Sequence, residues 1–103
     1  MRKHTVETYE RAREVMAHYG TVRESRPSRG APTFAQIEVT TRPTPAETPD
    51  QARELAVVAL DVGGRLTLSI FDGPNGTTGI DLTLVVYRNA TAAEVMAILD
   101  GAP

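Results

Sequence analysis

The fold of this chain is decided by RLTLSIFDGPNGTTGIDLTLVVYR, residues 65–88. Aliphatic and polar residues alternate on both sides of a cluster of glycine, proline and asparagine, so every second side chain can face the same side of a sheet. The alternation predicts two strands, 65–72 and 79–88, joined as a hairpin. The residues expected on the buried face are Leu66, Leu68, Ile70, Ile80, Leu82, Leu84 and Val86.

The connecting loop, FDGPNGTTGID at 71–81, resembles a phosphate-binding loop only in its glycine content. A phosphate cradle requires a glycine-rich segment that leads into a helix N-terminus, whereas this one leads into a strand. Asp72, Asn75 and Asp81 could suggest calcium, but proline and glycine occupy ligand positions of an EF-hand loop. We therefore interpret the segment as a turn.

A second hairpin is predicted upstream, from a short strand at 21–25 to a strand at 33–42. TFAQIEVTTR alternates between Ala35, Ile37 and Val39 on one side and polar residues on the other.

Residues 5–19 predict an amphipathic helix, with Thr5 as N-cap and Gly20 as the C-terminal stop. Its apolar positions recur at helical spacing: Val6, Tyr9, Ala12, Met16 and Tyr19. Its polar face carries Glu7, Arg11, Glu14 and His18.

The segment 43–64 is ambiguous, because LAVVALDV suits a buried strand as well as a helix. Thr48 as N-cap, Pro49 at the first helical position and Gln51 three residues after the cap form a helix-start signal. We therefore predict a helix over 49–61, ended by the glycine pair that follows.

A last helix is predicted over 91–100, where Thr91 and Glu94 form a capping box. The fold class is therefore α+β: an N-terminal helix, then two ββα units at 21–61 and 65–100, in a single domain over 1–103. The four strands should form a mostly antiparallel sheet with helices packed on it.

Composition bounds the function classes. The 103 residues carry a net charge of −2 and no cysteine, which excludes disulfides, thiolate nucleophiles and cysteine-ligated metals. LAVVAL at 55–60, the longest apolar run, is too short to cross a bilayer, so we expect a cytoplasmic protein. One lysine beside ten arginines is typical of GC-rich bacterial or phage genomes.

Catalytic motifs are absent from the sequence. Its two histidines are His4, near the terminus, and His18, on the polar face of a helix. No nucleophile elbow, HExxH or P-loop pattern occurs, so we expect no enzyme, no metal and no cofactor.

Two candidate binding features remain. Arg23, Arg26 and Arg29 lie in one turn-rich stretch and could bind carboxylates or phosphates, or form an ordinary solvated loop. Phe34, Phe71, Val85 and Tyr87 should occupy the second face of the sheet. That face is either covered by the N-terminal helix or open to a partner or to self-association.

We therefore expect a non-enzymatic protein-binding module: a small adaptor, chaperone-like subunit or inhibitor, such as a bacterial immunity or phage counter-defence factor. The alternative is a nucleic-acid-binding protein, because residues 1–30 hold seven basic and four acidic side chains. The basic residues are Arg2, Lys3, Arg11, Arg13, Arg23, Arg26 and Arg29.

Overall fold

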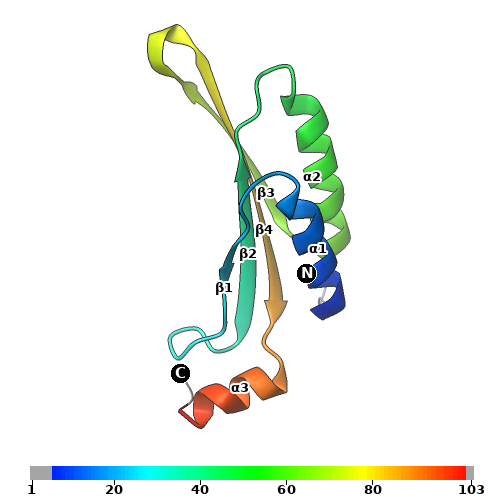
Figure 1. The fold of residues 1–103 in the computed structure, drawn as a ribbon, viewed down its shortest axis with the longest axis vertical. Coiled ribbons are helices and arrows are strands. Elements are labelled where there is room, and N and C mark those ends of the chain that lie inside the picture. Colours follow the sequence, from blue (N-terminus) through cyan, green and yellow to red (C-terminus); the bar gives the residue numbers. More distant parts are fainter. Residues whose placement is uncertain (1–5, 102–103) are drawn as a thin grey trace.

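The computed structural model describes residues 6–101. Its elements follow in the order α1 (Val6–Ala17), β1 (Arg23–Ser25), β2 (Phe34–Thr41), α2 (Thr48–Val62), β3 (Arg65–Asp72), a short 3₁₀ turn (Pro74–Gly76), β4 (Thr78–Asn89) and α3 (Ala92–Leu99). The strands form one four-stranded antiparallel sheet in the order β1-β2-β4-β3 (Figure 1). The predicted α+β class, with a helix first, is confirmed.

Both α1 and α2 lie on the same face of the sheet (Figure 1). α1 packs on β2 and β4, while α2 packs on β4 and β3. Of the two readings of the aromatic face, covering by the N-terminal helix is therefore wrong, because α1 joins α2 over the aliphatic face. The core between helices and sheet consists of Tyr9, Ala12, Met16, Ala35, Ile37, Val39, Leu55, Val62, Leu82, Leu84 and Val86.

α1 follows its predicted pattern, since Tyr9, Ala12 and Met16 are buried and Tyr19 packs against the core. The proposed cap Thr5 and the side chain of Val6 lie outside the described residues. The helix ends at Ala17 rather than at 19. Contrary to the prediction, Gly20 does not end the helix but allows close approach to β2: a Cβ at this position would lie 3.2 Å from the carbonyl oxygen of a β2 residue.

α2 confirms the helical interpretation of 49–61, and Gly63 ends it in the left-handed region with φ of 73°. The predicted capping box at Thr48 and Gln51 is wrong. Thr48 is already helical, and Gln51 accepts a hydrogen bond from a β2 threonine instead. The reciprocal pair lies four residues earlier: Thr44 N–H donates to the Glu47 carboxylate at 2.9 Å, and Glu47 N–H donates to Thr44 Oγ1 at 3.3 Å.

The β3–β4 hairpin has the predicted strands and a tight turn, in which Asn75 and Gly76 adopt positive φ. One expectation fails. Leu68 and Ile70 are 50% and 66% exposed, because the distal half of the hairpin projects beyond the helical layer (Figure 1). The structure is accordingly elongated, with extents of 54 × 27 × 22 Å.

α3 begins with the predicted capping box, in which Thr91 and Glu94 exchange hydrogen bonds. This helix differs from the expected ββα arrangement because it runs past the end of the sheet rather than across it (Figure 1). Its apolar residues Met96 and Leu99 are consequently more than half exposed.

Candidate functional site

Among residues 6–101, the sheet face opposite α1 and α2 is left open by both helices. Strand register assigns its residues, because directly paired residues in antiparallel strands point to the same side. Side by side on this face lie Arg23, Glu38, Val85 and Arg65, one from each strand. Val85 is nevertheless only 5% exposed, since longer side chains flank it on both neighbouring strands. The open face is thus polar at its centre.

An aromatic pair occupies the end of this face nearest α3. Phe34, the first residue of β2, and Tyr87 on β4 meet edge to face, with ring centroids 6.0 Å apart and planes at 74°. Phe34 is 44% exposed and Tyr87 is partly exposed. Aromatic rings held in this geometry form a rigid apolar contact with little side-chain entropy left to lose on binding.

Phe71 lies on the same face but far from that pair. It is directly opposite Gly79, and its ring covers the position where a Cβ of Gly79 would stand. Tyr87 is eight positions after Gly79 on β4, which corresponds to about 26 Å at about 3.3 Å per residue. The three aromatic residues therefore share a face, as expected, but do not form one cluster.

The three predicted arginines lie in different environments. Arg23 pairs with Glu38 across the β1–β2 ladder. Arg26 Nε is 3.4 Å from the Glu24 carboxylate, and its side chain is 82% exposed. Arg29 is exposed at the tip of the β1–β2 loop, beside the end of α3 at Gly101. The structure thus places positive charge on β1 and the β1–β2 loop, partly neutralised by two glutamates.

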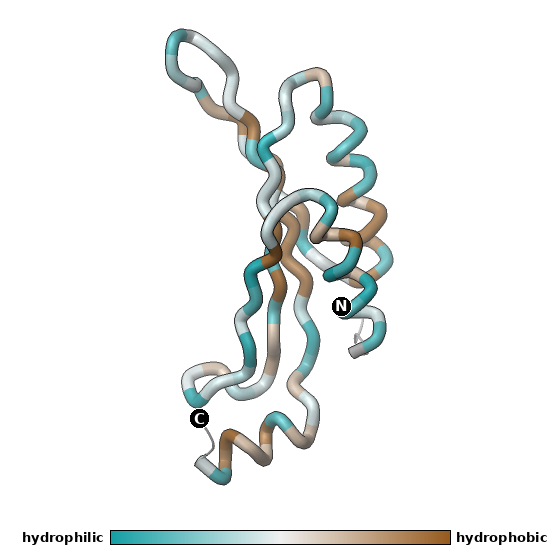
Figure 2. Tube along the Cα trace, viewed as in Figure 1, coloured by the Kyte–Doolittle hydropathy of each residue, from teal (hydrophilic) through white to brown (hydrophobic). Residues whose placement is uncertain are grey.

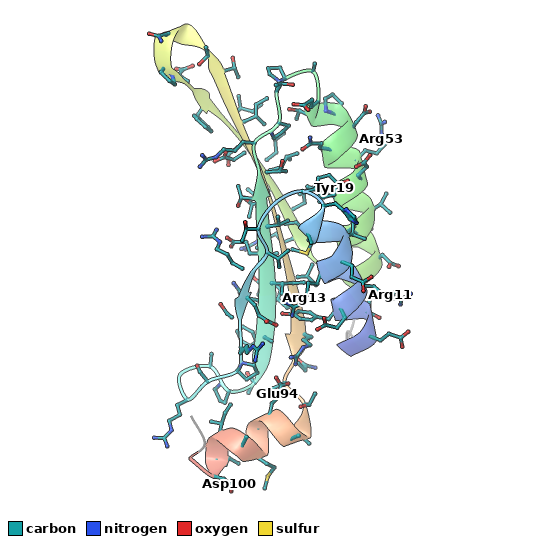
Figure 3. The ribbon with its side chains drawn as sticks, viewed as in Figure 1. Arg11, Arg13, Tyr19, Arg53, Glu94 and Asp100 are labelled. Atoms are coloured by element: carbon teal, nitrogen blue, oxygen red, sulfur yellow. The ribbon has the colours of Figure 1, made fainter. Side chains whose placement is uncertain are left out.

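A polar network on the helix-covered face was missed by sequence reasoning. Both Nη atoms of Arg13 donate to Glu24, at 3.3 and 2.5 Å, and both Nη atoms of Arg88 donate to Glu94, at 2.6 and 3.1 Å. The two guanidinium groups lie over the Tyr9 ring, with Cζ 5.6 and 5.0 Å from its centroid. Arg13 extends from α1 toward the sheet, and Glu94 lies where β4 leads into α3 (Figure 3). The network therefore ties α1, β1, β4 and α3 together.

The electrostatics of this network follow from its contacts. Burial raises the pKa of Tyr9 to about 12, with the nearby Glu24 charge adding to the effect. Hydrogen bonds from Arg88 lower the pKa of Glu94 from 4.5 to about 2. Arg13 lowers the pKa of Glu24 in the same way. All four charged groups therefore remain ionised over the physiological range. One signal could have revealed the network: Arg88 continues the buried-face alternation of Leu82, Leu84 and Val86.

A shallow groove of about 310 Å³ separates α1 from α2. Its walls are Thr8, Arg11, Ala12, Val15, Val57, Val58, Asp61 and Val62. His18 is exposed, as predicted, but it lies in the turn after α1 rather than on the helix, whereas His4 lies outside the described residues. Between residues 6 and 101, no three histidine, aspartate or glutamate side chains gather closely enough to hold a metal ion.

None of the helices in the described part of the chain is long and apolar enough to cross a membrane. Comparison with protein-family models, curated proteins and solved structures found no match to this chain.

Proposed function

We propose that this chain is a non-enzymatic protein-binding module that covers a partner's surface with the open face of its sheet. The proposal rests on one observation: Phe34 and Tyr87 form a partly exposed aromatic pair on a face that none of the helices within residues 6–101 covers. Aromatic residues and arginine are the types that carry most binding energy in protein interfaces. Antiparallel sheets with one packed and one open face suit this use.

The charges around the pair favour a partner with carboxylates at the rim of its contact surface. Arg23 is 71% exposed on this face, and the exposed Arg29 extends from the adjacent loop, whereas Arg26 reaches Glu24 toward the helix-covered face. Guanidinium groups at a rim bind carboxylates in a forked geometry and accelerate association more than they add affinity. The partner's contact surface should therefore have an apolar centre and an acidic border.

A small adaptor, a chaperone-like subunit or an inhibitor would act in this way, without chemistry of its own. We favour a bacterial immunity factor or phage counter-defence factor, because the single lysine beside ten arginines fits a GC-rich bacterial or phage origin.

The test uses the full chain as bait in lysate of a GC-rich bacterium, with three variants compared against wild type. Phe34→Asp and Tyr87→Asp place a charge in the aromatic pair, while Val57→Asp places the same charge on α2, on the opposite side of the sheet. We expect a stoichiometric protein bound by wild type and Val57→Asp but lost with both aromatic variants. A partner indifferent to both aromatic variants, or no stoichiometric partner at all, would refute the proposal.

Nucleic-acid binding is a further outcome that the test can recognise. Three of its candidate residues, Arg13, Arg23 and Arg26, lie beside glutamates, which reduces the positive field available to phosphates. Filter binding at two salt concentrations discriminates the classes, because phosphate contacts make affinity fall steeply with salt. Retention at low salt that disappears at high salt would contradict the protein-binding proposal.

A further inference from the structure

β3 is an edge strand without the usual protection. Its neighbour in the sheet is β4 alone, so the backbone groups along its outer side have no strand to pair with among the described residues. Residues 66–71, LTLSIF, contain no charge and no proline. The opposite edge is different: β1 has three residues, and Arg23, Arg26 and Pro27 discourage further pairing. Only one edge of this sheet is therefore open to extension.

The exposed side chains of β3 extend the apolar core toward this edge. Leu66 packs against the core under α2, whereas Leu68 and Ile70, on the same face, are at least half exposed. Figure 2 shows apolar residues continuing from the core into the projecting hairpin. An additional strand beside β3 would bury these side chains without any change in the sheet.

We propose that the occupant of this edge is β3 of a second copy, paired antiparallel about a twofold axis at Leu68. Residues 66–70 are nearly palindromic about Leu68. In this register Leu66 is opposite Ile70 of the second copy, and Thr67 is opposite Ser69 of the second copy. Like side chains therefore meet on each face, as an isologous contact requires.

The ends of the paired segment are also compatible. Arg65 lies opposite Phe71 of the second copy, a cation beside an aromatic ring, and no two like charges face each other. If the second copy's strand were shifted by a single residue, its apolar side chains would lie on the face opposite to those of the first copy. The alternation of side chains therefore specifies the register of the pairing. The product is a continuous eight-stranded sheet in which Leu66 of each copy lies beside Ile70 of the other, on the face that carries the helices.

This dimer goes beyond the proposed function and leaves that surface free. Phe34 and Tyr87 lie at the other end of the sheet, on β2 and β4. The dimer would therefore present two aromatic pairs, and either proposal can fail while the other holds.

The first test is a crosslink, which the cysteine-free chain makes unambiguous. In the Leu68→Cys variant each new thiol faces its twin, with Cα atoms about 4.5–5.5 Å apart, within the range of a disulfide. Mild oxidation should give a covalent dimer in high yield. Thr77→Cys, at the hairpin turn, is the control and should remain uncrosslinked, because the register places it far from its own copy.

The second test measures mass by light scattering over a hundredfold concentration range. Wild type should show a concentration-dependent dimer, and Ile70→Lys should weaken dimerisation at least tenfold, since the lysine would replace an apolar side chain that lies against Leu66 of the other copy. Ile70 is 66% exposed, so the monomer should keep its circular dichroism spectrum. Val57→Lys, a comparable change at a residue 62% exposed on α2, should remain dimeric.

A monomer at every concentration would overturn the inference. So would a dimer that Ile70→Lys leaves intact, or a dimer of the Leu68→Cys variant that does not crosslink on oxidation. A folded monomer whose β3 edge instead accepts an extended peptide from another protein would likewise refute pairing with a second copy.

Discussion

Replacing Glu94 with glutamine should destabilise the protein by about 2 kcal/mol near neutral pH, and this loss should vanish in acid. Glutamine retains an oxygen that can accept the Thr91 N–H, so the capping box persists. The charge facing Arg88 is removed. Because the Arg88 side chain is only 10% exposed, its guanidinium is then left partly buried without a carboxylate.

The magnitude follows from the displacement of the Glu94 pKa. Arg88 is the largest cause of its fall from 4.5 to about 2. A difference of this size corresponds to about 3.4 kcal/mol at about 1.36 kcal/mol per pH unit. The Thr91 N–H contributes part of the shift and also bonds glutamine, and the Glu94 side chain is still 29% exposed, so solvent screens the pair. About 2 kcal/mol is what remains for the charge itself.

The folded pKa lies below the unfolded value, so this stabilisation is complete above pH 4.5 and is lost as the pH falls toward 2. Urea unfolding of wild type and Glu94→Gln, followed by circular dichroism from about pH 6 downward, should therefore give free energies that converge in acid. Thr91→Ala is the control: it removes the cap but keeps the ion pair, and should cost about 1 kcal/mol with little dependence on pH. A Glu94→Gln deficit that stays constant with pH would refute the reasoning.

Three further changes test the core and its close contacts. Tyr9→Phe should raise the free energy of unfolding by about 1 kcal/mol, because the buried Tyr9 hydroxyl has no hydrogen-bond partner within the described chain; a loss of stability in urea titration would argue for an unseen partner. Gly64→Ala should lower the free energy of unfolding by about 2 kcal/mol, since the new Cβ would lie 2.8 Å from a β4 carbonyl oxygen. The control is Gly30→Ala, which has open space around the new Cβ and should leave the melting temperature nearly unchanged. Leu55→Ala should lower the free energy of unfolding by about 3 kcal/mol, because the Leu55 side chain is fully buried. Leu60→Ala should lower it by under about 0.5 kcal/mol in the monomer, because the Leu60 side chain is 78% exposed. Similar losses for the two variants in calorimetry would contradict the packing described.

The strands were predictable from the alternation of side chains, because a strand with one buried face has an apolar residue at every second position. The predicted strand 65–72 matches β3, and β2 and β4 differ from prediction by one residue at each end. The alternation could not show how much of each strand the helices α1 and α2 cover. Leu68 and Ile70 carry the same pattern as Leu66, yet they project past the helices, since hairpin length and helix placement are set by different parts of the chain.

Local start signals were right about the existence of α2 and wrong about its cap. Two threonines, Thr44 and Thr48, each precede a glutamate or glutamine by three residues, so sequence spacing alone cannot rank them. The Thr44–Glu47 pair closes in the structure, while Gln51 is drawn to a threonine on β2. A tertiary contact decided between two equivalent local motifs.

The candidate site was predictable in its parts but not in its layout. Because every second residue of a strand points to the same face, the sequence assigns Phe34, Phe71 and Tyr87 to one face. The strand register confirms this assignment. Their separation depends on position along the strands, and Phe71 belongs to the distal hairpin. Alternation along β4 could have placed Arg88 on the buried face, but it could not show that Arg13 and Tyr9 of α1 lie beside it.

The projecting hairpin also affects how this molecule will behave in transport measurements. Its radius of gyration is 16.0 Å, against about 13 Å for a compact chain of this length. Such a particle experiences more friction than a sphere of 11.1 kDa and will elute early from a sizing column even as a single copy. Retention volume would overstate its mass, so association can be judged only by methods that weigh the particle independently of its shape.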